Sequence, residues 1–120
     1  GRVFRSQDLV LWLMTTFYKN AAVDLTTTNV TVVYTAPAAK TAIFKSILVS
    51  NDSGSADTIT LTLTNAAAAV FSLYKLEEVG ALSTRELLEQ PLVLETAEII
   101  KAQAATAGRL HVVASYMEIT

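Results

Sequence analysis

Residues 57–64, with the sequence DTITLTLT, alternate between aliphatic and threonine side chains. Successive side chains of a β-strand point to opposite faces of its sheet, so this alternation predicts a strand with one aliphatic face and one hydroxyl face. Threonine is β-branched and suits a pleated, solvated surface. We therefore expect Ile59, Leu61 and Leu63 to pack in a core. The threonine face is a candidate for subunit contact, and it comprises Thr58, Thr60, Thr62 and Thr64.

Residues 34–51, YTAPAAKTAIFKSILVSN, predict the end of one strand, a turn and a longer strand. Pro37 lacks a backbone N–H and ends the first strand. Strict alternation over residues 43–51 places Ile47 on one face of the second strand and Phe44 on the other. The sequence NDSGSAD that follows is dense in turn formers and predicts a loop.

Strand-like segments recur along most of the chain, and no helical period separates them. This succession predicts an all-β fold, which we expect to be a single antiparallel β-sandwich with jelly-roll-like winding. A length of 120 residues fits one such domain. The other predicted strands cover residues 30–35, 69–76, 84–90, 98–104 and 109–119.

Residues 1–19 differ from the rest and are predicted to form an N-terminal apolar arm or short helix, with the β-sandwich domain over residues 20–120. Their apolar block LVLWLM is far shorter than the ~20 residues that span a bilayer. The backbone entropy lost on ordering an arm nearly balances what its side chains gain by burial, so the arm needs a ready groove. We expect that groove on the chain's own sandwich or on a neighbouring subunit. The candidate interface residues are Leu9, Val10, Leu11, Trp12, Leu13, Phe17 and Tyr18.

The charge content limits the classes of partner. Charged residues make up 17% of the chain, below the typical quarter, which favours either uncharged faces used in assembly or a compact monomer. The nine Lys and Arg residues are scattered and the net charge is −2, which argues against nucleic-acid binding. The absence of cysteine excludes a disulfide scaffold, a thiolate zinc site and a cysteine nucleophile.

Few residues suggest chemistry. The single histidine, His111, cannot build a multi-histidine metal site, and no serine lies in a nucleophile-elbow pattern. Glu86 and Glu89 would point to opposite faces of a strand, which does not favour their acting as a pair. The loop at residues 51–57 offers side-chain oxygens, but its spacing is not that of a calcium hand. We predict no catalytic, cofactor-binding or metal-binding residue, and no enzyme.

Three stretches, VYTAPAAKTAIFKSILVSNDSGSADTITLTLT, LLEQPLVLETAEIIKAQA and GRLHVVASYMEIT, together resemble small β-sandwich virion proteins of tailed bacteriophages. The resemblance covers roughly residues 16–120 and rests on structural motifs. It implies a non-enzymatic virion structural protein and does not choose between head and tail positions. We favour a capsid decoration or cement subunit, because a 120-residue chain without a fibre stalk suits a small accessory subunit. We also expect a homo-oligomer whose partners are other virion proteins, either the major capsid protein or tail proteins. Ala39 stands where that group often has glycine, which suggests a turn without a positive φ.

Two alternatives remain open. The chain could be a tail, baseplate or fibre component that contacts other tail proteins or a host glycan. It could also be a stand-alone carbohydrate-binding module, which would need exposed aromatic rings for sugar stacking. The candidate rings are Trp12, Tyr18, Tyr34, Tyr74 and Tyr116.

Overall fold

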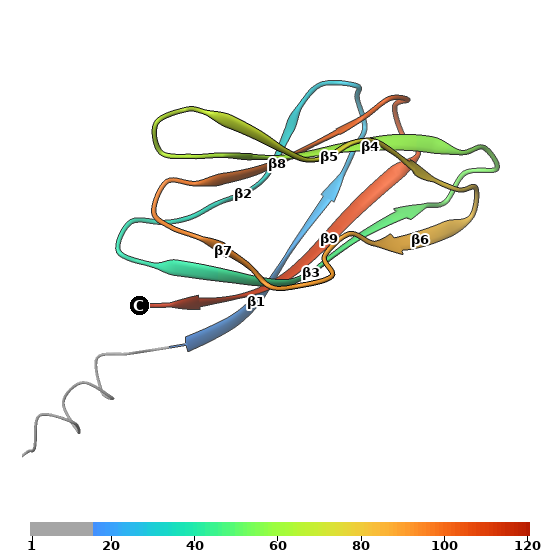
Figure 1. Ribbon diagram of the computed structural model, residues 1–120. Helices are drawn as coiled ribbons and strands as arrows, with labels where there is room; N and C mark the ends of the chain where they lie inside the picture. Colours follow the sequence, from blue (N-terminus) through green and yellow to red (C-terminus); the bar gives the residue numbers. More distant parts are fainter. Residues whose placement is uncertain (1–15) are drawn as a thin grey trace, which may run out of the picture.

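The computed structural model describes residues 16–120, which fold into two packed antiparallel sheets (Figure 1). Sheet A has the strand order β1-β9-β3-β6, and β7 also pairs with β3. Sheet B has the order β2-β8-β4-β5. The predicted all-β antiparallel sandwich is thus confirmed, while its jelly-roll winding stays a prediction. The strands are β1 (Thr16–Asp24), β2 (Thr31–Thr35), β3 (Thr41–Asn51), β4 (Asp57–Thr64), β5 (Val70–Val79), β6 (Ser83–Glu86), β7 (Leu92–Leu94), β8 (Ile99–Ala104) and β9 (Leu110–Ile119).

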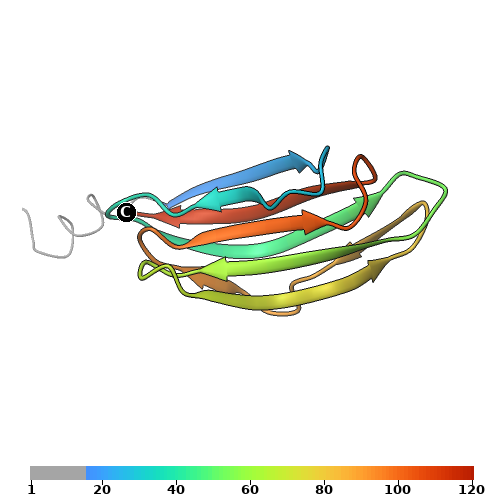
Figure 2. The same cartoon turned by 90° about the horizontal axis from the view of Figure 1, so that it is seen from above.

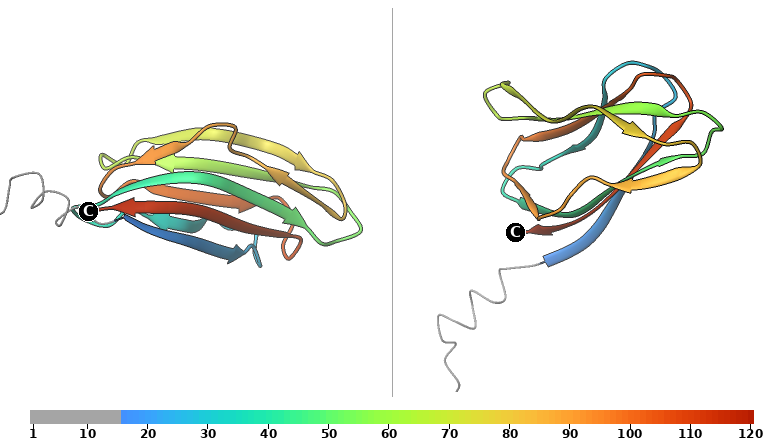
Figure 3. Two further views of the ribbon diagram at one scale, coloured as in Figure 1. Left: turned by 90° about the horizontal axis from the view of Figure 1, so that it is seen from below. Right: turned by 45° about the vertical axis from the view of Figure 1, so that its right-hand side comes forward.

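The strands of both sheets run along one common long direction, with β1 and β5 at opposite margins (Figures 2 and 3). Every strand pair in the two sheets is antiparallel. Residues 16–120 contain no helix long and apolar enough to cross a membrane.

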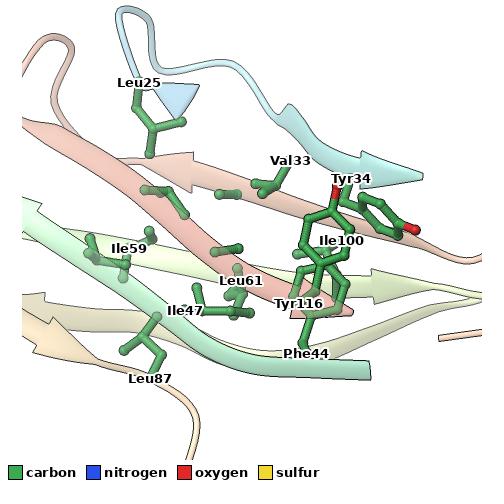
Figure 4. Close-up of a cluster of buried hydrophobic side chains, with 14 of the residues drawn as sticks. Leu25, Val33, Tyr34, Phe44, Ile47, Ile59, Leu61, Leu87, Ile100 and Tyr116 are labelled. Carbon is green, nitrogen blue, oxygen red and sulfur yellow. The ribbon is translucent and has the colours of Figure 1, made fainter. Parts of the chain in front are cut away.

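The core lies between the sheets and is built mainly from aliphatic side chains (Figure 4). Ile59 and Leu61 of β4 are fully buried and Leu63 packs against them, as the alternation in residues 57–64 predicted. Facing them from sheet A are other fully buried side chains, among them Phe44, Ile47, Val49, Leu110 and Val112.

Strand β3 departs from strict alternation. Phe44 and Ile47 are both fully buried, so the prediction that they lie on opposite faces was wrong. The cause is a β-bulge: the register with β9 shifts between Phe44 and Ser46, and Lys45 is the extra residue. A bulge places two residues opposite one and thereby resets the in-out phase of the strand.

The boundary between arm and sandwich falls earlier than residue 20. Residues 16–19 belong to β1, whereas the sequence predicted that they are part of the arm. Only Ala21 and Val23 of this strand are half-buried, so it lacks the aliphatic alternation that marks β4. The short strand β7 follows Pro91 directly and was not predicted either.

The turn between β2 and β3 contradicts the expectation about Ala39. Its φ is 60°, in the left-handed region that glycine adopts without steric cost. Alanine is therefore held in a strained conformation at this position.

Candidate interaction surface

The structure separates the two predicted interface residues that it describes. Both Phe17 and Tyr18 lie on β1, and successive residues of a strand face opposite ways. Tyr18 points away from sheet B and is 82% exposed, whereas Phe17 points toward the inter-sheet side. The other five predicted residues lie outside the described residues, so their role stays a prediction. They are Leu9, Val10, Leu11, Trp12 and Leu13.

The side of sheet A that faces away from sheet B, called outer face A below, carries two apolar rows. In the first row, Met117 of β9 is opposite both Tyr18 of β1 and Ile43 of β3. Ile43 is in turn opposite Val93 of β7, which is exposed. The pairing register therefore aligns four apolar side chains from four strands in one line across the sheet.

The second apolar row crosses the same face nearer the other end of the strands. Val113 of β9 is opposite Ala22 of β1 and Leu48 of β3. Val113 and Leu48 are both about two-fifths exposed. Between the two rows runs an uncharged polar row made of Asn20, Ser115 and Ser46.

An open hollow of about 340 Å³ lies next to the polar row. The β3 bulge brings Lys45 to its wall, so the hollow combines two lysines, Lys19 and Lys45, with neutral polar and aromatic groups. It offers no pair of acidic and basic groups suited to proton transfer. Its lining residues are Tyr18, Lys19, Asn20, Lys45, Ser115 and Tyr116.

Glu118 of β9 is a buried carboxylate at the end of the sandwich where β1 begins. Its Oε1 lies 2.8 Å from Lys19 Nζ and 3.8 Å from Lys40 Nζ, and its Oε2 accepts a hydrogen bond from the Tyr34 hydroxyl. The hydrogen bonds from Lys19 and Tyr34 hold the pKa of Glu118 below its ordinary value, against the opposing effect of burial. Burial and the same hydrogen bond raise the pKa of Tyr34. Glu118 thus ties the edge strand β1 and the β2–β3 turn to the core.

Phe17 covers this ion cluster. Its ring centroid lies 5.7 Å from Lys19 Nζ and 5.7 Å from Lys40 Nζ, which is cation–π distance for both. Because Phe17 is opposite Glu118 in the β1–β9 register, its ring lies on the same side of the sheet as the carboxylate. The predicted interface residue Phe17 is therefore engaged within the chain, although 43% of its surface is exposed.

Three aromatic rings pack together in the core (Figure 4), and the hydroxyl of one of them, Tyr34, joins them to the ion cluster. The ring centroids of Tyr34 and Tyr116 are 4.5 Å apart, and Phe44 stacks on Tyr116 at 4.9 Å. Both tyrosines are only 8% exposed. They serve the core and do not present the free ring faces that sugar stacking requires.

Sequence reasoning did not select Glu118, although a signal was present. In β9 the buried positions are Leu110, Val112, Ala114 and Tyr116, and Glu118 continues this period of two. A charged residue in phase with a buried row must find partners, since an unpaired buried charge is costly.

His111 lies at the far end of outer face A. Its Nε2 is 3.3 Å from Asp24 Oδ1, and its Nδ1 is 3.9 Å from Asp52 Oδ2. The imidazole therefore links β9 to the end of β1 and to the β3–β4 loop. Within residues 16–120, no group of three or more His, Asp or Glu side chains is arranged to hold a metal ion.

Asn51 and Asp57 of the oxygen-rich loop at residues 51–57 form hydrogen bonds to backbone groups of the loop and of neighbouring segments. Asn51 accepts hydrogen bonds from the backbone N–H and the hydroxyl of Ser53, and its amide donates to the carbonyls of Ser55 and Val79. Asp57 accepts from the N–H groups of the two residues Thr58 and Thr106. These contacts account for the residue types that suggested a cation loop.

The carboxylate of Glu86 stabilises the β3 bulge from the neighbouring strand β6. It accepts hydrogen bonds from the Ser46 hydroxyl and from the N–H groups of Ile47 and Leu88. Burial alone would raise the pKa of Glu86, but these donors together lower it. The carboxylate thus has a structural role at the sheet edge.

The outer face of sheet B differs from outer face A. Its threonines alternate with the buried aliphatics as predicted, and they are half-buried, except for Thr64, which is 7% exposed. Lys101 lies opposite Thr62, and Gln103 opposite Thr60. The middle of this face is therefore polar and carries a cation among its hydroxyl groups, while exposed apolar side chains, Val32 and Val70, lie on its edge strands β2 and β5.

Comparisons with known proteins support the fold. No family model and no curated protein matches the chain. A solved structure of Bacillus endospore appendages, described as a novel family of disulfide-linked pili, is similar with a TM-score of 0.50 and 10% identity over 88% of each chain. At this identity the similarity shows a shared sandwich fold alone.

Two structures of infectious bursal disease virus also match, with lower similarity. The Gx strain gives a TM-score of 0.43 at 10% identity, and the Gt strain gives 0.40 at 9% identity. Each match covers 88% of this chain but 32% of the virus chain, so the chain spans about a third of that protein's length. These scores are too low to add to the fold comparison.

Proposed function

We propose that this chain is a non-enzymatic structural subunit that packs against copies of itself and against other proteins of an assembled particle. The observation that supports this most is outer face A, where two apolar rows cross the sheet with a neutral polar row between them. Burial of apolar side chains aligned in this way against a partner lowers the free energy of the complex, because it removes them from water. A flat face of this kind suits protein contact better than the binding of a small molecule.

More specifically, we propose a bacteriophage virion as the particle, and a capsid decoration or cement subunit as the role. The three stretches that resemble phage virion proteins support this assignment, and the fold shared with a pilus subunit agrees with a subunit of an extracellular assembly. The 120-residue sequence has no cysteine, so its contacts would not include disulfides. Many weak contacts, multiplied over the copies on a particle, would then stabilise the shell.

A tail, baseplate or fibre position uses the same contacts and is the alternative within the virion. The carbohydrate-binding alternative has less support, because Tyr34 and Tyr116 are buried and Tyr74 is half-buried. Among the described candidate rings, this leaves Tyr18 as the one well exposed ring.

The contact role of outer face A can be tested with Val113→Glu. If the face is buried by a partner, the new carboxylate would have to be desolvated there, and association should weaken by about tenfold or more. The matched control is Val32→Glu on sheet B, where Lys101 lies opposite and the side chain is 50% exposed. The measurement is particle mass by light scattering over a concentration series. Equal masses for both variants and the parent would contradict the role of this face.

The virion role requires particles. Filled heads that lack the protein should release DNA at a lower temperature than heads to which the purified chain has been added back. Val113→Glu should fail to restore the release temperature, and Val32→Glu should restore it. Binding of the isolated chain to a glycan array, without any effect on heads, would favour the carbohydrate-binding alternative.

A further inference from the structure

The two sheets end in edge strands, and β1 differs from all the others. Strand β2 has five residues and an irregular register, while β6 and β7 have four and three residues. Strand β5 shifts register twice against β4. Strand β1, in contrast, pairs with β9 over nine residues without any shift. Proteins usually protect edges with short strands, bulges or charges, because an open edge accepts another strand.

The direction of the free backbone groups of β1 follows from one hydrogen bond. The N–H of Leu25 donates to the carbonyl of Leu110 at 3.0 Å, next to the paired residues Asp24 and His111. Hydrogen-bonded and non-hydrogen-bonded pairs alternate along an antiparallel ladder. The odd-numbered residues 17–23 therefore bond to β9, and the N–H and C=O groups of Tyr18, Asn20 and Ala22 point outward. Residues 16–120 supply no hydrogen-bond partner for these outward groups.

Side-chain charge does not protect this edge. Strand β1 has two charged residues, Lys19 and Asp24. The ammonium group of Lys19 is drawn to the buried carboxylate of Glu118, which directs it toward the inter-sheet side. Asp24 lies at the last position of the strand and contacts His111. The middle of the edge is therefore regular, and its one charge, on Lys19, is paired with Glu118.

We propose that β1 of a second copy of this chain pairs antiparallel with β1, about a two-fold axis at Asn20. The inference rests on the proposed self-association and adds the contact that would produce it. Two copies of one strand related in this way present the same outward groups to each other, so each free N–H meets a free C=O. The three outward residues of each copy would form about six main-chain hydrogen bonds, two for each paired position.

The register is selected by overlap and charge. An axis at Asn20 pairs all nine residues, because Thr16 then faces Asp24 of the second copy. It places Phe17 opposite Val23, which is a favourable aromatic and β-branched pair. An axis at Lys19 would instead place two lysines directly opposite each other, which is destabilising. Moving the axis to Ala21 would shorten the overlap.

Pairing in this register would also join the apolar rows of the two copies. Tyr18 ends the first row of outer face A, and Ala22 ends the second row. With the axis at Asn20, Tyr18 of one copy lies opposite Ala22 of the other. The first row of each copy would therefore continue into the second row of its partner, across one extended sheet.

A single cysteine tests the register, since the natural chain has none. The axis brings Asn20 of both copies within ~5.5 Å between Cα atoms, inside the range that a disulfide spans. The matched control is Ala22→Cys, whose two copies would be four residues out of register and ~13 Å apart. After mild oxidation, Asn20→Cys should give a covalent dimer in at least about tenfold higher yield than Ala22→Cys. A mixture of Tyr18→Cys and Ala22→Cys chains should give the mixed dimer, which provides a second test if Asn20→Cys folds poorly.

The outcomes separate this inference from the proposed function. Equal cross-linking of Asn20→Cys and Ala22→Cys, in chains that light scattering shows to be oligomeric, would overturn the β1 pairing and leave self-association standing. Such a result would place another segment at the contact. A monomeric mass together with no cross-linking in any variant would overturn both the pairing and self-association. Selective cross-linking at Asn20 and in the mixed pair would support both.

Discussion

Strands β1 and β5 are the long edge strands of this sandwich, and they differ in how far their free backbone groups are open to a further strand. Strand β5 carries Lys75, Glu77 and Glu78, and its register with β4 shifts twice. At its bulge Leu76 has a φ of 53°, and the backbone N–H of Leu76 donates to the Thr60 hydroxyl at 3.2 Å. Strand β1 has no such device in its middle, and its one central charge is held by Glu118.

The difference shows how one sheet protein can resist association at one margin and permit it at the other. Bulges and projecting charges make β5 a poor template for a further strand. Strand β1 is a good template for a further strand, because its pairing is regular and its lysine is neutralised by Glu118. Each of the following substitutions either removes a difference between the two edges or measures its contribution to stability.

The largest effect is expected from prolines placed at neighbouring positions of β1. Ala21→Pro removes an N–H that bonds to β9, and should lower the free energy of unfolding by about 3 kcal/mol. Ala22→Pro removes an outward N–H, and should cost less than about 1 kcal/mol while blocking the edge. Urea unfolding of both variants at low protein concentration measures the difference. Equal losses would mean that the assignment of inward and outward groups is wrong.

A smaller effect is expected at the carboxylate that holds Lys19. Glu118→Gln should lower the free energy of unfolding by about 2 kcal/mol at pH 7, because charged hydrogen bonds to Lys19 and Tyr34 are lost. The control is Glu89→Gln at an exposed position, where the change should stay within about 0.5 kcal/mol.

The pH dependence of the same variant has a definite sign. The folded-state pKa of Glu118 is lowered, so the unfolded chain binds more protons as the pH falls below the ordinary glutamate value of about 4.3. The contribution of Glu118 is therefore fully present at neutral pH and is lost as the pH falls through the folded-state pKa. The parent should lose stability faster than Glu118→Gln in this acidic range, and parallel curves would contradict the assigned role.

The smallest effect is expected at the β5 bulge. Leu76→Gly should raise the free energy of unfolding by about 1 kcal/mol, because glycine adopts a positive φ without steric cost and the lost leucine side chain is 62% exposed. Lys75→Gly, at the adjacent residue without a positive φ, should instead lower it by about 0.5–1 kcal/mol. Thermal unfolding compares the two, and a shared sign would show that Leu76 is not strained.

The sequence predicted the fold where the two faces of a strand differ in chemistry. In β4, aliphatic and threonine side chains separate cleanly, and both the strand and its orientation were predicted correctly. The β3 bulge could not be predicted, because its partner Glu86 is distant in sequence and contacts Ser46 and Ile47 only after folding. Strand β1 was missed because most of its side chains are exposed, which leaves no apolar period.

The candidate surface was predictable only in part. Tyr18 was selected because it is aromatic, and it does lie on the exposed face; Phe17 was selected for the same reason but lies over the ion cluster. The rows of outer face A depend on the register between four strands, and such pairing is not encoded in any single segment. Glu118 gave a readable signal through its phase in β9, but its partners come from distant segments.

The pairing of Thr16 with Ile119 puts the start of β1 beside the end of β9 (Figure 1). A pulling force applied at Thr16 along the axis of β1 would load the whole nine-residue ladder in shear, so that its hydrogen bonds share the tension. A force that drew Thr16 away from Thr120 would instead unzip the ladder one pair at a time. A tether attached ahead of Thr16 would therefore act on the sandwich in its mechanically strong direction when it pulls along β1, and in the weak direction when it pulls away from Thr120.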